Sequence, residues 1–308
     1  MRVIMKPLIV LTAIIASVVA AAAGVGVMLG SGILHPYRKP LTADEISVAD
    51  RRFAEVHAIR TDFDVSAADG AKLREWKVRA EKPNGDWIVI LHGLGDNRLG
   101  QVGYATFLLA HGYGAVMMDA RAQGESGGEI ATYGWKERND SRVIDDALLA
   151  TEPARHLFYF GESMGAAIAL QSAAVDPRIA GVVAEDPFSN LREVTYDYAG
   201  LQFSPLLGKT LFRPAAIMAL LQAEKEGGFK AADVSPEQAV AARAFPVLLI
   251  CGTEDHKIPC RHARRIFDKA TGPKELWIVK GAGHSMAYGV EREEFERRVL
   301  RFFGSWAN

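Results

Sequence analysis

Six short apolar runs, each nearly continuous and each closing on glycine or a polar residue, recur along the chain. Runs this short and this apolar are typical of strands buried on both faces, as in a parallel sheet covered by helices. Strand and helix alternate, which predicts an α/β doubly wound domain. The six runs are WIVILHG, GAVMMDA, HLFYFGES, IAGVVAEDP, FPVLLICG and ELWIVKGAGH. Helix-like segments separate these runs, at about 98–111, 137–150, 163–175, 260–270 and 290–303.

Two further regions complete the expected domain. VHAIRTDFDVSA and AKLREWKVRA alternate in polarity around ADG, which predicts an antiparallel hairpin ahead of the first run. The interval at about 190–240 is longer than one crossover helix requires, and it is apolar with helical spacing. It predicts a small helical cap over the carboxyl ends of the strands, where open α/β sheets bind ligands. The expected fold is therefore an eight-stranded, mostly parallel sheet with helices on both faces and a cap.

The N-terminus differs from the rest of the chain, because Leu8–Leu34 contains no charged residue. A membrane-spanning helix needs roughly 20 apolar residues, so this segment predicts an anchor. The alternative is a cleaved signal peptide, because VVAAAAG offers small residues for cleavage. The apolar region of a signal peptide spans only about 7–15 residues, which favours a retained transmembrane helix.

The expected organisation is an anchor at 1–34, a polar linker at 35–54 and the α/β domain at 55–308. We expect a single-pass membrane protein with its N-terminus in the cytoplasm and the catalytic domain outside. This orientation rests on the basic residues that flank the apolar segment. They are Arg2 and Lys6 before it, and Arg38 and Lys39 after it.

Composition excludes one class of partner. The chain has 308 residues, of which 49% are hydrophobic and 24% charged, as in a globular protein. The net charge is −1 and no block of like charges occurs, so nothing indicates nucleic-acid binding. The sequence leaves the oligomeric state open.

Ser163 lies in GESMG, directly after the third apolar run and at the start of a helical segment. G-x-S-x-G at a strand–turn–helix junction is a nucleophile elbow, in which Gly161 and Gly165 allow a tight turn. The helix N-terminus favours negative charge that develops beside the serine. The alternative is a glycine-rich turn with a capping serine. The position after a buried strand favours the elbow, with Ser163 as nucleophile.

A serine hydroxyl needs an adjacent base, and that base needs an orienting acid. His284 ends the last run, in a glycine-containing loop downstream of the serine. Asp255 follows the fifth run in CGTEDHKIPC and is the expected acid. Glu254 is a close rival, and Asp186 is a more distant one. The chain order Ser163, Asp255, His284 matches the order Ser, Asp, His of such triads.

An oxyanion hole would complete the site. Its first N–H is expected from Met164, the residue after the nucleophile. Its second is expected from the loop HGLGDN after the first run, at Leu94. Backbone donors leave the side chains free, so neither residue needs to be polar. No cofactor or metal site is expected.

Cys251 and Cys260 bracket the loop that carries Asp255. An exported domain would oxidise them to a disulfide, whereas two free thiols are the alternative. The C-x-x-C spacing of zinc sites does not occur.

Several of these stretches together resemble the α/β-hydrolase fold family, from about residue 55 to the C-terminus. They are LHGLGDN, MMDARAQGESGG, GESMG, GTEDHKIP and GAGH, in that order. The chain is most similar to bacterial serine esterases and to lysophospholipase- or peptidase-like hydrolases with a short cap. The resemblance implies that Asp119 to Ser126 is a structural loop. The serine at the elbow argues against dehalogenases and epoxide hydrolases, which carry aspartate there. The cytosolic members of the family lack an apolar N-terminal segment such as the one in this chain.

The expected function is a membrane-anchored serine hydrolase that cleaves carboxylic esters of small acyl or lipid-like molecules. An acyltransferase, thioesterase or peptidase with the same triad is the alternative enzyme, and an idle membrane-anchored binding scaffold is the non-enzyme alternative. The apolar cap residues either accept an acyl or aromatic group or simply pack the cap onto the domain. They are Leu201, Phe203, Leu206, Leu207, Leu211 and Phe212.

Overall fold

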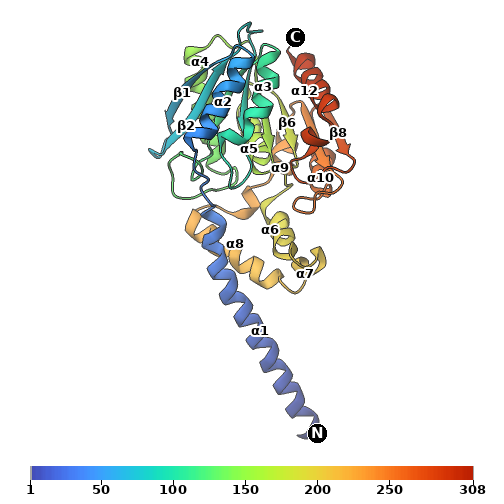
Figure 1. Cartoon of the computed structure of the whole chain (residues 1–308). Coiled ribbons are helices and arrows are strands. Elements are labelled where there is room, and N and C mark those ends of the chain that lie inside the picture. The colour runs from blue at the N-terminus through green and yellow to red at the C-terminus, as the bar shows by residue number, and fades with distance from the viewer. Residues whose placement is uncertain (1, 308) are drawn as a thin grey trace.

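The computed structural model describes residues 2–307 (Figure 1). Within this range, some side chains lie outside the described set, namely those of residues 2–8, 11, 12, 14–16, 18, 19, 22, 23 and 205. One sheet of eight strands forms the centre, in the order β1-β2-β4-β3-β5-β6-β7-β8. This confirms the predicted α/β fold with a mostly parallel sheet.

The predicted hairpin forms the antiparallel edge of the sheet. β1 (Ile59–Ser66) pairs with β2 (Lys72–Arg79) around a turn in which Gly70 has a φ of 83°. β2 also pairs antiparallel with β4. The hairpin therefore extends the parallel sheet on one side, as its alternating pattern predicted.

The six apolar runs form the parallel part of the sheet. They are β3 (Trp87–Leu91), β4 (Gly114–Met118), β5 (Leu157–Glu162), β6 (Ile179–Glu185), β7 (Val247–Gly252) and β8 (Lys274–Val279). β3 lies between β4 and β5, so the strand order reverses there. Ligands bind beside the carboxyl ends of strands at such a reversal.

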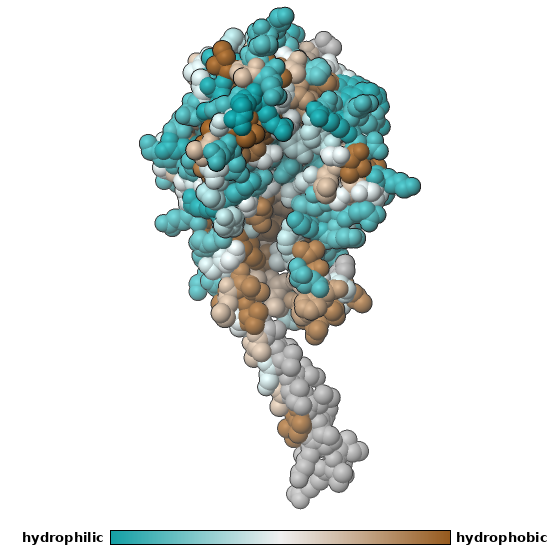
Figure 2. Space-filling model, viewed as in Figure 1, coloured by the Kyte–Doolittle hydropathy of each residue, from teal (hydrophilic) through white to brown (hydrophobic). Residues whose placement is uncertain are grey.

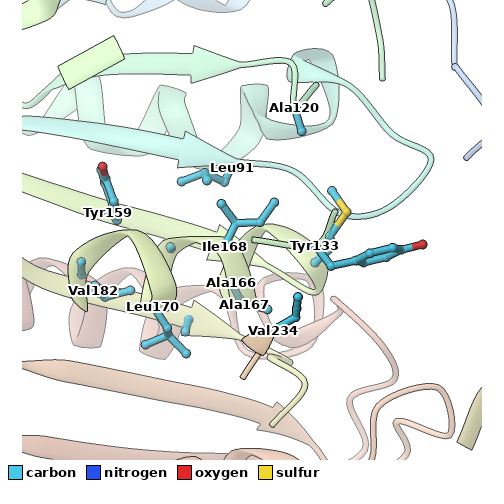
Figure 3. Close-up of a cluster of buried hydrophobic side chains, with 14 of the residues drawn as sticks. Leu91, Ala120, Tyr133, Tyr159, Ala166, Ala167, Ile168, Leu170, Val182 and Val234 are labelled. Carbon is cyan, nitrogen blue, oxygen red and sulfur yellow. The ribbon is translucent and has the colours of Figure 1, made fainter. Parts of the chain in front are cut away.

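Helices cover both faces of the sheet and bury two separate cores. One core is built largely on α4 (Glu137–Thr151), α5 (Met164–Val175) and α10 (Arg261–Lys269). In it, Ala166, Ala167, Ile168 and Leu170 of α5 meet Leu91 and Val182 of the sheet (Figure 3). The other core is built largely on α2 (Ala43–Glu55), α3 (Val102–Ala110) and α12 (Arg292–Trp306). All of the predicted helices in the domain are present, and the 3₁₀ turn η1 (Arg98–Gln101) precedes α3.

Helix α2 lies in the interval 35–54 that was expected to be a linker, so that expectation was wrong for its second half. Thr42 caps the helix and pairs reciprocally with Glu45 in a capping box. Phe53 is buried against Trp76, with ring centroids 6.4 Å apart. The sequence TADE carries the capping-box signature, which is the signal that could have revealed this helix.

Helices occupy the interval at about 190–240, where a cap was predicted. α6 (Leu191–Gly200), α7 (Pro205–Lys209) and α8 (Arg213–Gly227) lie beyond the carboxyl ends of the strands (Figure 1). The 3₁₀ turn η2 (Ala231–Asp233) and α9 (Pro236–Ala242) lead back to β7. A buried hydrogen-bonded group pins α6 to α10, since His262 contacts Ser189 Oγ (2.9 Å) and Asp197 (2.7 Å).

The N-terminal segment is one helix, α1 (Arg2–Leu34), whose second half runs beside α8 and whose first half projects away from the domain (Figure 1). No helix within the described part of the chain combines the length and the hydropathy of a membrane span. Much of the predicted anchor falls on residues whose side chains lie outside that part. The anchor therefore stays a prediction.

Candidate active site

Ser163 lies at the sharp turn between β5 and α5. Its backbone has φ 53° and ψ −117°, in a region that non-glycine residues rarely adopt. Such strain persists where the surroundings impose it, commonly at functional sites. A Cβ on Gly161 would lie 2.5 Å from the Gly165 carbonyl, and one on Gly165 would lie 2.2 Å from Leu91 O. The turn therefore needs glycine at both flanking positions, because its backbone segments approach too closely for a side chain.

His284 and Asp255 lie in the loops after β8 and β7, beside the serine. His284 Nε2 is 2.9 Å from Ser163 Oγ, and His284 Nδ1 is 2.7 Å from Asp255 Oδ2. The structure thus brings together three side chains that the sequence places far apart. The imidazole can accept the serine proton at Nε2 while Nδ1–H donates to the carboxylate.

The two rival acids differ from Asp255 in position. Asp255 is buried, and its Oδ1 accepts the backbone N–H groups of Lys257 (2.8 Å) and Ile258 (2.9 Å). Glu254 is exposed. Asp186 Oδ2 lies 4.0 Å from His284 Nδ1 and accepts the Ser285 N–H at 2.7 Å. Geometry therefore favours Asp255 as the partner of the imidazole, and Asp186 is the next nearest of the rival carboxylates.

Cys251 and Cys260 form a disulfide, with their Cα atoms 5.5 Å apart. Of the two alternatives that the sequence left open, the structure therefore contains the disulfide and not two free thiols. Cys251 is the penultimate residue of β7, and Cys260 immediately precedes α10. The bond therefore closes the loop that holds Asp255 at its base.

Buried carboxyl groups lie beneath the triad, and the sequence analysis did not single out two of them. Burial, with a repulsive contribution from Glu162, raises the pKa of Glu185 to about 8. Burial and the nearby Asp96 raise the pKa of Glu162 to about 7, and burial and Asp255 raise that of Asp186 to about 8. Glu185 accepts hydrogen bonds from Tyr104 Oη (2.9 Å) and Ala287 N (3.0 Å). These buried carboxyl groups therefore hold their protons more strongly than exposed carboxyl groups do.

Leu94 and Met164, the expected oxyanion donors, border the same cavity as Ser163. The loop with Leu94 is held by two contacts just after that residue. Gln123 Oε1 accepts the Gly95 N–H at 2.6 Å, and Asp96 pairs with Lys39 at 2.8 Å. His92, which directly follows β3, is buried, and its Nε2 accepts the Ala120 N–H at 3.0 Å. Its ring therefore braces the loop.

The loop from Asp119 to Ser126 is held by its own polar side chains. Asp119 accepts the N–H groups of Arg98 (2.7 Å) and Glu125 (2.8 Å), and Ser126 Oγ donates to Asp119 O at 2.7 Å. Arg121 pairs with Asp140 at 2.6 Å. These contacts fit the structural role that the resemblance implied.

Asp186, Asp255 and His284 are also the described group with donor atoms close enough to share a metal ion, within 4.8 Å of one another. Two of the three already pair with each other through a hydrogen bond. The same side chains therefore serve either a proton relay or a metal, and the contact with Ser163 favours the relay.

A cavity of about 630 Å³ extends from the serine toward the cap and α1. We call its side at the strand ends the floor, formed by Ser163, Met164, Leu94 and the residues beside them. We call its opposite side the roof, formed by α1, α6 and α8. Of the predicted cap residues, Phe203 and Phe212 line this cavity. The sequence analysis missed the contribution of α1, namely Val25, Leu29, Gly32 and Ile33.

Comparisons with known proteins agree with this architecture. Residues 82–214 match the family described as "Serine aminopeptidase, S33". YqkD of Bacillus subtilis, described as uncharacterised, is 30% identical over 252 residues, which are 79% of this chain and 79% of that protein. YfhR of Escherichia coli K12, also described as uncharacterised, is 24% identical over 247 residues, which are 76% of this chain and 77% of that protein.

Two similar solved structures are both from Pyrococcus. The Pyrococcus furiosus esterase Pf2001 has a TM-score of 0.72 and 22% identity, and the match covers 90% of this chain and 99% of the esterase. The Pyrococcus horikoshii acylaminoacyl peptidase has a TM-score of 0.64 and 17% identity, covering 84% of this chain and 43% of the peptidase. At these identities the likeness concerns the fold.

The fold and the strand-end site define a hydrolase, and the chain belongs to the α/β-hydrolase family.

Proposed function

We propose that this protein is a serine hydrolase that cleaves carboxylic esters. The observation that carries the proposal is the hydrogen-bond chain from Ser163 Oγ through His284 to Asp255, with distances of 2.9 and 2.7 Å. A serine becomes nucleophilic when an adjacent base takes its proton and a third group orients that base. The strained turn at Ser163 is the second support, because it presents the hydroxyl above the sheet.

In the proposed mechanism, Ser163 Oγ attacks the ester carbonyl carbon and transfers its proton to His284 Nε2. Asp255 stabilises the imidazolium, and the N–H groups of Met164 and Leu94 hold the oxyanion. The tetrahedral intermediate collapses, and the leaving alkoxide takes the proton from His284. A water molecule, deprotonated by His284, then cleaves the acyl-enzyme and releases the carboxylic acid and free Ser163.

Ester cleavage is favoured over peptide cleavage by the chemistry of the cavity. None of the residues found to line it carries a charge, so none of them grips a peptide terminus. A similar structure, the P. furiosus protein, is described as an esterase, whereas the S33 description and the P. horikoshii protein concern peptidases. A peptidase, thioesterase or acyltransferase with the same triad is therefore the second candidate. An idle scaffold would not need the hydrogen-bond chain.

Ester turnover tests this proposal. We expect the purified full chain to hydrolyse p-nitrophenyl acetate, and Ser163→Ala to lose activity by a factor of roughly 10³ or more. Ser305→Ala, on the exposed side of α12, is the matched serine control. Undiminished turnover by Ser163→Ala would overturn the assignment. Cleavage of peptides or thioesters, with no ester turnover, would favour the second candidate.

Residues 8–30 were expected to form a membrane anchor, and because Gly26 and Gly30 pack against α8, the proposed anchor is the projecting first half of α1, with the domain extracytoplasmic. The support is the uncharged length of Leu8–Leu34 and the disulfide, which forms in oxidising compartments. Cell fractionation and mass spectrometry of the mature N-terminus test the proposal. A soluble protein that starts near residue 25 would instead indicate a cleaved signal peptide.

A further inference from the structure

Helix α1 packs closely against α8 through two glycines on one face. A Cβ on Gly26 would lie 2.3 Å from Ala215 O, and a Cβ on Gly30 would lie 2.7 Å from Ala219 O. Both glycines are buried, and on α8 they face Ala215 with Met218, and Ala219 with Gln222. Glycines four residues apart let two helix backbones approach closely. The contact between α1 and α8 is therefore built into the sequence of both helices.

The end of α1 is also fixed to the hydrolase domain. Ala131 N donates to Leu34 O at 2.8 Å, and Tyr133 Oη donates to Ile33 O. Ser31 Oγ donates to Glu226 on α8 at 3.2 Å. These contacts join α1 to both α8 and the loop before α4. The second half of α1 is thus a fixed part of the domain and not a free tether.

The neighbouring face of α1 borders the cavity above Ser163. Val25, Leu29, Gly32 and Ile33 follow the spacing of one helical face, and all of them line the cavity. Val194 and Tyr198 of α6 also line the cavity, together with other uncharged residues. The volume of about 630 Å³ falls within the range of ligand sites, which is about 300–1,000 Å³.

Exposed apolar residues gather at the end of the domain where α1 and the cap lie. Figure 2 shows hydrophobic residues gathered on both sides of a furrow at the end of the domain from which α1 emerges. Phe203, Leu206, Leu211 and Leu221 are among the exposed apolar residues at this end. Phe203 both lines the cavity and is 71% exposed, so apolar surface continues from the outside of the domain into the cavity.

We propose that the α1 wall, defined by Val25, Leu29, Gly32 and Ile33, is one side of an acyl-chain site, and that the substrate is an ester of a long-chain carboxylic acid. This inference rests on the proposed function, because it needs the ester carbonyl at Ser163. The chain extends from the serine between α6 and α1, where it meets only apolar groups. Each buried methylene favours the bound state by about fourfold, so selectivity should grow with chain length. The N-terminal helix thereby becomes a determinant of substrate specificity.

Gly32 offers a test because a Cβ there meets no atom within 4 Å, although the residue lines the cavity. Gly32→Leu would project a side chain into the acyl-chain site without displacing α8, and leucine is a better helix former than glycine. Gly24→Leu is the matched control. It lies on the same helix, is equally open, and is not among the residues that line the cavity. Leu29→Trp, at a side chain that is 58% exposed, is a second way to obstruct the site.

The measured quantity is the ratio of kcat/KM for p-nitrophenyl decanoate to that for p-nitrophenyl acetate, with the decanoate kept monomeric. We expect a ratio well above one in the natural chain, a drop of at least about tenfold in Gly32→Leu and Leu29→Trp, and no change beyond about twofold in Gly24→Leu. A ratio that both obstructing variants leave unchanged would overturn the acyl-chain site, as would a natural chain that prefers acetate.

The two proposals fail in different ways. Suppose that p-nitrophenyl acetate is hydrolysed through Ser163 but that Gly32→Leu and Leu29→Trp leave the decanoate-to-acetate ratio unchanged. The proposed function then stands, and the acyl-chain site is wrong. If no ester is hydrolysed by the folded natural chain, both proposals are overturned. Circular dichroism and thermal melting of each variant exclude misfolding as the cause of a lost ratio.

Discussion

The floor and the roof of the cavity are built in different ways, although each depends on two glycines spaced four residues apart. On the floor, Gly161 and Gly165 let a strand turn sharply into a helix around Ser163. In the roof, Gly26 and Gly30 let α1 lie against α8. The first pair shapes a turn within one short stretch of chain, whereas the second joins two helices that are distant in sequence. A local motif therefore determines the chemistry. A contact between helices that are distant in sequence determines the proposed substrate selectivity.

The largest expected effect concerns the floor, at the acid that orients His284. Asp255→Asn should lower kcat by roughly 10³–10⁴, because the amide no longer stabilises the imidazolium or its correct tautomer. Glu254→Gln, at the exposed neighbouring residue, is the control and should change kcat by less than about twofold, since an exposed charge is well screened. Steady-state kinetics on p-nitrophenyl acetate provide the measurement. A larger loss in the glutamate variant would exchange the two roles.

The same substitution in each glycine pair contrasts floor and roof directly. In Gly165→Ala the new Cβ would collide with Leu91 O, so we expect the elbow to distort and turnover of every ester to fall by at least about 10². In Gly30→Ala the Cβ would collide with α8, so α1 should shift and the decanoate-to-acetate ratio should fall several-fold. Gly24→Ala, in open space, is the control. Equal losses for both esters in Gly30→Ala would refute the separation of chemistry from selectivity.

A smaller effect is expected from the disulfide at the edge of the floor. Its closed loop is short, since the two cysteines are separated by 9 positions, so its entropic contribution to stability should be below about 3 kcal/mol. Reduction should therefore lower the melting temperature modestly, and should lower kcat more because Asp255 is held less firmly. Thiol titration, calorimetry and kinetics on oxidised and reduced protein measure both effects. A full loss of stability with an unchanged kcat of the folded fraction would contradict this account.

The smallest effect concerns the pH dependence of stability. Because the native pKa of Glu185 is about 8 and its unfolded pKa is near 4.5, the native state binds the proton more strongly. This contribution to stability is complete below about pH 4.5 and is lost as the pH rises through about 8. The free energy of unfolding should fall with rising pH in this window, by at most about 1.4 kcal/mol per pH unit for this proton.

Glu185→Gln tests that slope, because glutamine still accepts the N–H of Ala287 but does not titrate. Urea unfolding between pH 5 and pH 8 should give a flatter dependence in this variant. Part of the slope should persist, because Asp186 and Glu162 have raised pKa values and contribute with the same sign. An unchanged slope would show that Glu185 does not bind a proton in the native state.

The sequence was sufficient to predict the sheet, the hairpin and the covering helices, because continuous and alternating apolar patterns reflect burial directly. It also selected Ser163, His284 and Asp255, but bare sequence ranked Asp255 only narrowly above Glu254. Adjacent residues in a loop face different directions, and only the folded loop aims one carboxylate at the imidazole.

Two features were missed for different physical reasons. α2 was taken for part of a linker, although Thr42 and Glu45 carry the capping-box signature, since its polar face masked the buried Phe53. The α1 wall could not be inferred from the sequence. An uncharged helix is expected in an apolar environment, but its sequence does not distinguish a lipid bilayer from the wall of a cavity. Its partner α8 lies far along the chain, so Gly26 and Gly30 acquire meaning only when Ala215 and Ala219 are seen against them.

Covalent labelling by alkyl fluorophosphonates tests the central claim most directly, because it reports chemistry and selectivity together. The labelling rates of a decyl and an ethyl probe would be measured on the natural chain and on Gly32→Leu, and the adduct located by peptide mass spectrometry. We predict that both probes modify Ser163, that the decyl probe reacts faster with the natural chain, and that Gly32→Leu lowers the decyl-to-ethyl ratio by at least about tenfold. An adduct on another residue would contradict the assignment of the nucleophile, and equal ratios in the two proteins would contradict the role of α1.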